Sequence, residues 1–111
     1  MIYAINVFNL TAQGDAAYRE YSLKAGKIIY GLGGKVISAG RDPIRELHGE
    51  ITRRCLIVVE FPDIKVFDAF IAEADRQGIH ELREGSTCDY IWTLYEPWDL
   101  KAFVAGEAGP H

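Results

Sequence analysis

The chain has 111 residues, with 16 acidic and 12 basic side chains, a formal net charge of −4 at pH 7 and an isoelectric point near 5.3. A chain of this length forms one domain and can bury a core without metals or disulfides. The acidic balance provides neither a basic field for nucleic acid nor a polybasic segment for anionic lipid, which argues against both kinds of partner. We expect a single domain over residues 1–111, with its core in residues 2–96 and a tail in residues 97–111.

The apolar segments and the cysteines indicate a cytoplasmic protein. No apolar run approaches the ~20 residues that span a bilayer. The opening segment MIYAINVFNL has the composition of a short strand, without a basic leader or a cleavage site. Cys55 and Cys88 each lie in a strand-like run, at a spacing that fits neither a CxxC redox motif nor a zinc cluster. Both cysteines are therefore expected to be reduced core residues.

Two different hydrophobic periods predict the first strand and the first helix. Residues 2–9, IYAINVFN, are rich in β-forming side chains and are expected to form a strand. In residues 14–33, apolar side chains recur at steps of three or four, which predicts a helix with Thr11 or Asp15 as its N-cap. The apolar stripe of this helix consists of Ala17, Tyr21, Ala25, Ile28 and Leu32.

The glycine-rich stretch GLGGK, residues 31–35, raises the question of a phosphate-binding loop. Such loops run from a strand into a helix, so that the helix N-terminus faces the anion. Here the glycines follow a helix and precede a strand, and Lys35 is followed by Val36 instead of Ser or Thr. We therefore reject the phosphate loop and expect Gly33 or Gly34 to end the helix in a left-handed conformation.

The rest of the chain predicts three more strands and a second helix. Residues 35–39 are expected to form a short strand, with a candidate continuation in residues 44–49. Residues 54–61 and 87–96 are rich in apolar and β-branched side chains and predict the other two strands. Asp63 opens the second helix. The apolar stripe of the second helix consists of Phe67, Phe70, Ile71 and Ala74.

The order of these elements predicts an α+β fold of the ferredoxin-like type, βαββαβ, with a four-stranded antiparallel sheet and two helices on one face. Such a sheet normally alternates apolar and polar residues, yet residues 54–61 and 87–96 carry apolar side chains on both faces. Because the helices cover only one face, we expect a second copy to cover the other in a twofold homodimer, which is the dimeric α/β barrel arrangement. A helical partner or a different protein is the alternative.

Five short motifs support a family resemblance. They are YREY at 18–21, GGKV at 33–36, LHGE at 47–50, EFPD at 60–63 and LRE at 82–84. In this order they resemble the domain-of-unknown-function family 1330, within the dimeric α/β barrel superfamily, over roughly residues 2–96. The resemblance implies the fold and the dimer and leaves the function open. Other barrels of this superfamily include cofactor-independent monooxygenases and lactone isomerases, which bind small molecules between sheet and helices.

Three charged or titratable side chains are candidates for catalysis or anion binding. His48 and His80 have the side chain best suited to proton transfer near neutral pH, although both fall in predicted loops or turns where a solvated histidine is common. Arg83 matches the LR position of the family and could hold a carboxylate or phenolate. The alternative for Arg83 is an ion pair with Glu81, with Glu84 or with the second helix.

Three further residues are candidates for ligand binding. Asn6 is a polar amide inside a predicted buried strand, where it needs a partner such as a ligand, a water or the backbone. Tyr21 and Trp92 are large aromatic side chains whose hydroxyl and indole N–H also need partners when buried, although both residues can equally be core aromatics. The spacing of histidines and carboxylates predicts no metal site, and no motif indicates a cofactor.

Two functional hypotheses follow from these candidates. The first is a cofactor-independent enzyme, similar to the monooxygenases or isomerases, acting on a small organic molecule in a sheet–helix pocket, with His48 or His80 as the base and Arg83 as the anion clamp. The second is a non-catalytic homodimer that binds a small ligand or has a structural role. The sequence leaves open whether the protein is an enzyme.

Overall fold

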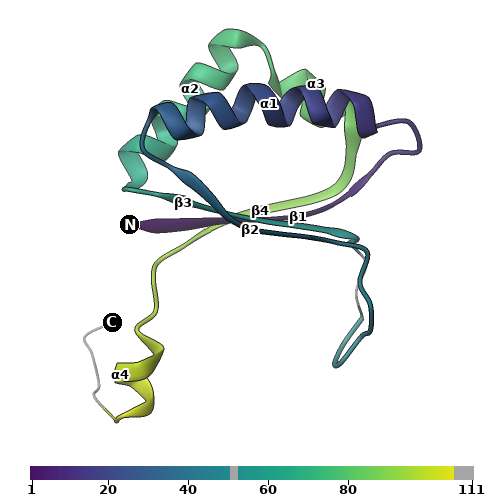
Figure 1. The fold of residues 1–111 in the computed structure, drawn as a ribbon. Coiled ribbons are helices and arrows are strands. Elements are labelled where there is room, and N and C mark those ends of the chain that lie inside the picture. Colours follow the sequence, from purple (N-terminus) through teal and green to yellow (C-terminus); the bar gives the residue numbers. More distant parts are fainter. Residues whose placement is uncertain (51–52, 107–111) are drawn as a thin grey trace.

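The computed structural model describes residues 1–50 and 53–106. A four-stranded antiparallel sheet, in the order β2-β3-β1-β4, carries three helices on one face, while a fourth helix lies on an arm on the opposite side (Figure 1). This arrangement confirms the predicted ferredoxin-like fold and adds two short helices to it. The elements are β1 (Ile2–Leu10), α1 (Asp15–Gly31), β2 (Lys35–Arg41), β3 (Cys55–Phe61), α2 (Ile64–Gln77), α3 (His80–Ser86), β4 (Thr87–Tyr95) and α4 (Leu100–Val104).

The C-terminus of α1 shows why the glycine-rich stretch is there. Gly33 has φ +90°, and its N–H donates to the Tyr30 carbonyl oxygen at 3.2 Å. The N–H of Gly34 donates to the Ile29 carbonyl oxygen at 2.8 Å. These two bonds form a Schellman motif, which ends a helix with a left-handed glycine. The prediction that a glycine terminates this helix is confirmed at Gly33.

The N-terminus of α1 differs from the prediction. The N-cap is Gly14, and no side chain caps the helix, so the prediction of Thr11 or Asp15 as the cap is wrong. The Thr11 hydroxyl donates instead to the Ser86 carbonyl oxygen at 3.4 Å, and the Thr11 N–H donates to the same oxygen at 3.0 Å. A Cβ at Gly14 would collide with that carbonyl. The close approach of this turn to α3 therefore decides the residue at the cap.

The second helix begins and ends as its sequence indicates. The Asp63 carboxylate accepts a hydrogen bond from the Val66 N–H at 2.9 Å, which makes Asp63 the N-cap of α2. Gly78 ends the helix with φ +70°. Phe70 and Ala74, two residues of the predicted stripe, are buried against the sheet.

Aromatic side chains fill the core beneath α2. Phe61 on β3 lies 5.7 Å from Phe70 and 5.2 Å from Phe67, measured between ring centroids. Phe61, Phe70 and Ile79 are almost completely buried. This cluster fixes α2 on the sheet and forms one end of the space between the sheet and the helices.

Two local irregularities correct predictions about the strands. β2 ends at Arg41, and residues 44–49 are not a continuation, because Asp42 takes a left-handed conformation with φ 58° and breaks the ladder. Asp89 takes a similar conformation, with φ 54°, where the pairing of β4 with β1 shifts register. Because the bulge interrupts the alternation of β4, Cys88 is exposed, and the prediction that it is a core residue is wrong. Cys55 is buried, as predicted.

The sheet face away from α1, α2 and α3 carries apolar side chains on neighbouring strands. Leu56 on β3 is 39% exposed, and Ile91 and Tyr95 on β4 are 41% and 55% exposed. Val7 on β1 pairs with both Leu56 and Ile91, and Ile5 lies two residues before Val7 on the same face of β1. This outer sheet face, defined by these five residues, confirms that β3 and β4 are apolar on both sides.

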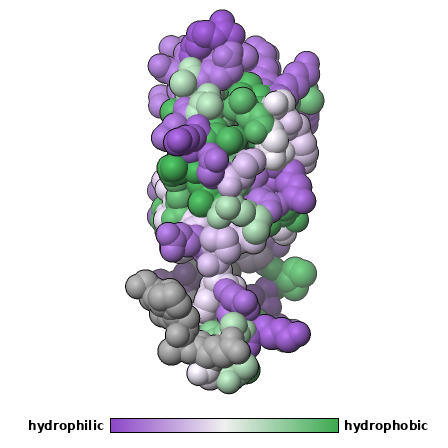
Figure 2. Space-filling model, turned by 90° about the vertical axis from the view of Figure 1, so that its left-hand side faces the viewer, coloured by the Kyte–Doolittle hydropathy of each residue, from purple (hydrophilic) through white to green (hydrophobic). Residues whose placement is uncertain are grey.

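The arm after β4 projects on the side of the outer sheet face (Figure 1). Asp99 caps α4 by accepting from the Ala102 N–H at 3.0 Å, and the rings of Trp98 and Phe103 lie 5.1 Å apart. Figure 2, which views the left-hand side of Figure 1, shows hydrophobic side chains in the middle of the body and the arm below it. None of the described helices is long and apolar enough to cross a membrane.

Candidate functional site

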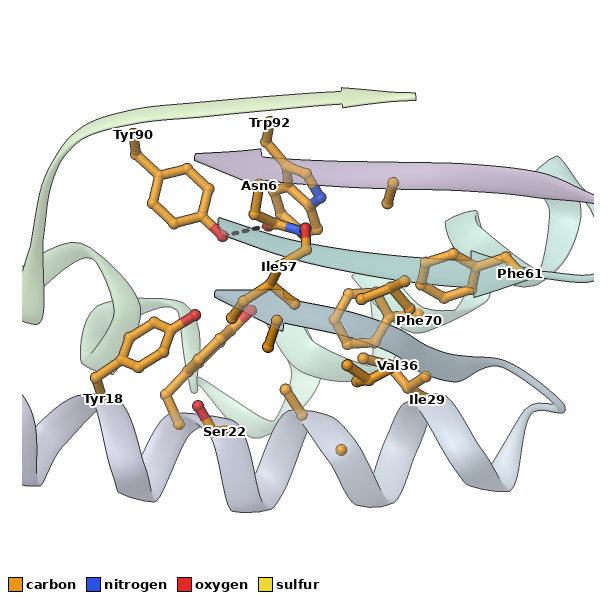
Figure 3. Close-up of a pocket in the computed structure, with 16 residues that line it drawn as sticks. Asn6, Tyr18, Ser22, Ile29, Val36, Ile57, Phe61, Phe70, Tyr90 and Trp92 are labelled. Carbon is orange, nitrogen blue, oxygen red and sulfur yellow. Dashed lines mark hydrogen bonds between the residues drawn. The ribbon is translucent and has the colours of Figure 1, made fainter. Parts of the chain in front are cut away.

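A cavity of about 230 Å³ lies between α1 and the inner face of the sheet (Figure 3). All four strands and α1 contribute to its wall, which is mostly apolar. Ile29, Phe61 and Phe70 lie toward one end. The other end contains the polar side chains of Asn6, Tyr18, Ser22, Tyr90 and the indole of Trp92.

Asn6 on β1 connects its two neighbouring strands, β3 and β4, at the polar end. Its side chain is nearly buried, at 5% exposure, because it alternates with Ala4 and Phe8 on the inner face of β1. The Asn6 Nδ2 donates to the Ile57 carbonyl oxygen on β3 at 3.3 Å, and the Asn6 Oδ1 accepts from the Tyr90 hydroxyl on β4 (Figure 3). The amide therefore holds Tyr90 in place, and the backbone supplies one of the partners that the sequence required.

The three buried tyrosines near the cavity are held in their neutral form. Burial raises the pKa of Tyr18, Tyr90 and Tyr21 above the ordinary value of 10.0. At Tyr21 the charge of the Arg83 guanidinium and its hydrogen bonding to the phenol act in the opposite direction on the pKa. At neutral pH these hydroxyls can donate and accept hydrogen bonds, but they cannot act as bases.

Arg83 reaches this polar end from α3. Its Cζ lies 5.0 Å from the ring centroid of Tyr90 and 5.3 Å from that of Trp92, within the range of cation–π contacts. The side chain is only 15% exposed, while Glu84, at 3.9 Å, is 69% exposed. The Arg83 Nε is buried and has no hydrogen-bond partner among the described residues. The guanidinium therefore lies in aromatic surroundings, hydrogen-bonded to the Tyr21 phenol, with a distant and solvated carboxylate beside it.

Trp92 is fixed at the cavity wall by other aromatic rings. Its ring centroid lies 5.6 Å from that of Phe67, 6.3 Å from that of Phe70 and 6.0 Å from that of Tyr90, all in edge-to-face geometry. The Trp92 Nε1 is buried and, within the described part of the chain, has no acceptor. The cavity is the place where such an acceptor can bind.

Gly26 gives the cavity part of its space. It lies inside α1, lines the cavity, and has nothing within 4 Å of the position that a Cβ would take. A glycine inside a helix costs about 0.5–1 kcal/mol relative to alanine. Gly26, Tyr18 and Tyr90 were not among the site residues expected from the sequence, although a glycine inside an amphipathic helix pattern is a recognisable signal for a packing or functional role.

The histidines lie outside the cavity wall. His48 is exposed in the connection between β2 and β3. His80 begins α3, one turn before Arg83, and its Nδ1 is buried without a partner among the described residues. The structure thus brings together Asn6, Tyr21 and Trp92, places Arg83 beside them and leaves His48 apart. In the described residues no group of three His, Cys, Asp or Glu side chains could hold a metal ion.

The sequence of this chain matches the model of a known protein family. The family model described as "Domain of unknown function (DUF1330)" matches residues 2–93. The chain belongs to the DUF1330 family. The family resemblance of the ordered motifs is therefore confirmed, and the family description assigns no function to this DUF1330 domain. The comparison with curated proteins gave no match.

Several solved structures resemble this DUF1330 domain. RPA0582, a protein of unknown function from Rhodopseudomonas palustris, has a TM-score of 0.77 at 21% identity, covering 88% of this chain and 82% of that one. A dabb family protein with a ferredoxin-like fold from Mesorhizobium loti has a TM-score of 0.58 at 17% identity, covering 87% and 96%. SnoaB, a cofactor-independent oxygenase from Streptomyces nogalater, has a TM-score of 0.59 at 10% identity, covering 88% and 93%. Similarity at these identities shows a shared fold alone.

Proposed function

We propose that the protein is a cytoplasmic homodimer that binds a small organic molecule in the cavity between α1 and the sheet. The observation that supports this function is a mostly apolar cavity of about 230 Å³ with polar groups converging at one end. Ligand sites commonly combine apolar walls with a few placed polar groups. Since a cavity of about 150 Å³ can hold benzene, this one has room for a molecule of roughly ten non-hydrogen atoms.

The outer sheet face supports the homodimer. Leu56 on β3 and Ile91 and Tyr95 on β4 are large apolar side chains that remain exposed on either side of β1. A second copy packed face to face around a twofold axis would remove this surface from water on both subunits at once. Cys55 and Cys88 are free thiols, which fits a reducing compartment such as the cytoplasm.

Native mass spectrometry of freshly purified protein tests both parts of the proposal. We expect the mass of a dimer, with each subunit carrying a small retained molecule. A Gly26→Leu variant should remain dimeric and lose the retained mass, because the added side chain enters the cavity. A monomer would contradict the dimer. An equal retained mass in the variant would contradict the cavity as the binding site.

A cofactor-independent enzyme, similar to a monooxygenase or an isomerase, is the second candidate. It is favoured by the donors at the polar end, because Trp92 and the neutral tyrosines could stabilise negative charge on a bound molecule. The described cavity wall contains no carboxylate, imidazole or amine, so the base must come from outside it. His80 on α3 is the better candidate, and His80→Ala should abolish turnover of the retained molecule while His48→Ala leaves it unchanged. Equal turnover in both variants and the wild type would rule out this role for His80.

A further inference from the structure

At the polar end of the cavity the Asn6 amide has its hydrogen-bond partners, while two buried donors near it do not. The Asn6 side chain uses its Nδ2 on a carbonyl oxygen and its Oδ1 on the Tyr90 hydroxyl. Two buried donors have no partner within residues 1–50 and 53–106: the Nε1 of Trp92, which lines the cavity, and the Nε of Arg83, which lies against the rings of Tyr90 and Trp92 without lining the cavity itself. A buried donor without an acceptor costs free energy, and a water molecule is a mobile substitute for a fixed partner. The site is therefore complementary to a ligand that brings acceptor atoms.

The positive charge of the Arg83 guanidinium also favours a ligand that brings acceptor atoms. The Arg83 guanidinium lies within 5.3 Å of the ring centroids of both Tyr90 and Trp92 and is mostly buried. Its carboxylate neighbour, Glu84, is 3.9 Å away and largely in solvent, where water weakens its effect. A buried cation is stabilised by an anion that also leaves water. An anionic ligand oxygen would supply that partner.

The opposite end of the cavity defines the rest of the ligand. Phe61, Phe70, Ile29 and Val36 present apolar surfaces there, away from the polar groups (Figure 3). Aromatic and aliphatic walls favour an apolar ring, and Gly26 leaves room beside it. The cavity is thus amphipathic along its length, with donors at one end and hydrocarbon at the other.

We infer that the cavity binds a small aromatic acid, whose anionic oxygen accepts a hydrogen bond from the Trp92 Nε1 and is neutralised by Arg83, and whose ring packs toward Phe61 and Phe70. This inference rests on the proposed binding function and adds the chemical class of the ligand.

Three probes of matched shape test the inference. Benzoate carries an anionic acceptor, benzamide a neutral acceptor, and isopropylbenzene no acceptor. The chain has two tryptophans, so a ¹⁵N-labelled sample gives two indole N–H resonances, from Trp92 and from Trp98 on the arm. Benzoate should shift the Trp92 resonance and leave that of Trp98 in place. We expect benzoate to bind at least about tenfold more tightly than isopropylbenzene, as a charge-assisted hydrogen bond requires, with benzamide between them.

Two substitutions separate the hydrogen bond from the charge. Trp92→Phe keeps an aromatic ring and removes the indole donor, so it should weaken benzoate and benzamide and leave isopropylbenzene unchanged. Arg83→Gln keeps polar atoms and removes the charge, so it should abolish the preference of benzoate over benzamide. Trp98→Phe on the exposed arm and Arg76→Gln on the exposed face of α2 are the matched controls and should change no affinity. A dispersed spectrum identifies the variants that are folded.

The outcomes distinguish this inference from the proposed function. If isopropylbenzene shifts the cavity resonances as strongly as benzoate, the cavity binds small molecules but the donor and charge argument is overturned. If benzoate binds and Arg83→Gln or Trp92→Phe binds it equally well, the assigned residues are wrong. If none of the probes shifts Trp92, the aromatic-acid class is overturned, while a molecule retained by the wild type and lost in Gly26→Leu still supports the binding function.

Discussion

Substituting Gly26 tests whether this glycine serves ligand binding, by leaving space in the cavity, at the expense of helix stability. Gly26→Ala should raise the free energy of unfolding by about 0.5–1 kcal/mol, because alanine is the better helix former and its Cβ meets nothing within 4 Å. The same methyl group enters the cavity and should weaken ligand binding. Thermal denaturation and ligand titration of one sample measure both effects.

Gly31 provides the control for this substitution. It lies on the same helix, its added Cβ would also meet nothing within 4 Å, and it does not line the cavity. Gly31→Ala should therefore leave ligand affinity unchanged. If both variants bound ligand as the wild type does, Gly26 would be an incidental helical glycine.

The buried tyrosines predict how stability depends on pH. Since burial raises the pKa of Tyr18 and Tyr90 in the folded protein above 10.0, their contribution is complete below pH ~10 and is lost as the pH rises further, where the unfolded chain ionises first. The free energy of unfolding should therefore fall above pH ~10. Tyr18→Phe should make this fall shallower in urea denaturation at several pH values. An identical slope in the wild type and Tyr18→Phe would contradict the assignment.

At the scale of the elements, α2 depends on its N-cap. Asp63→Ala removes the acceptor for the Val66 N–H and should lower the free energy of unfolding by about 0.5–2 kcal/mol in urea denaturation. Asp68→Ala, at an exposed position within the same helix, is the control and should have little effect. Equal losses in the two variants would indicate a general charge effect and not a cap.

The sequence predicted helix ends correctly where the residues that determine them lie only a few positions apart in the chain. Asp63 before an apolar stripe and Gly33 after one mark helix ends through hydrogen bonds to residues three to five positions away. Gly14 and Cys88 could not be predicted in this way. The first is decided by the approach of Ser86, and the second by a bulge that exists only where β4 pairs with β1. Both depend on segments that are distant in sequence.

The candidate site also combines residues that the sequence reveals with residues whose roles depend on contacts across the fold. Asn6 and Trp92 are visible in the sequence because a polar amide or an indole in a buried strand needs a partner. Tyr90 and Arg83 acquire their roles from contacts across the fold, the first through Asn6 and the second through the rings of β4. The cavity itself is a gap between α1 and the sheet, which a linear pattern does not encode.

At the scale of the whole molecule, the outer sheet face should control assembly. Ile91→Glu places a charge in the centre of the proposed dimer contact and should convert the dimer to a monomer, because burying an unpaired carboxylate is costly. Leu23→Glu, at an apolar and exposed position on α1, is the control and should leave the dimer intact. Light scattering during size-exclusion chromatography measures both masses. A dimeric Ile91→Glu variant would place the dimer contact elsewhere.

The position of β1 in the sheet has a consequence for how the protein is made. β1 is synthesised before β4, with which it pairs, and Tyr3 lies opposite Tyr95. Residues 11–86 must be synthesised before β4 begins, which takes about 4–15 s at ~5–20 residues per second. During that time β1 lacks one neighbour, and the wall formed by Tyr90 and Trp92 is absent. The cavity therefore closes only after translation has passed its last strand.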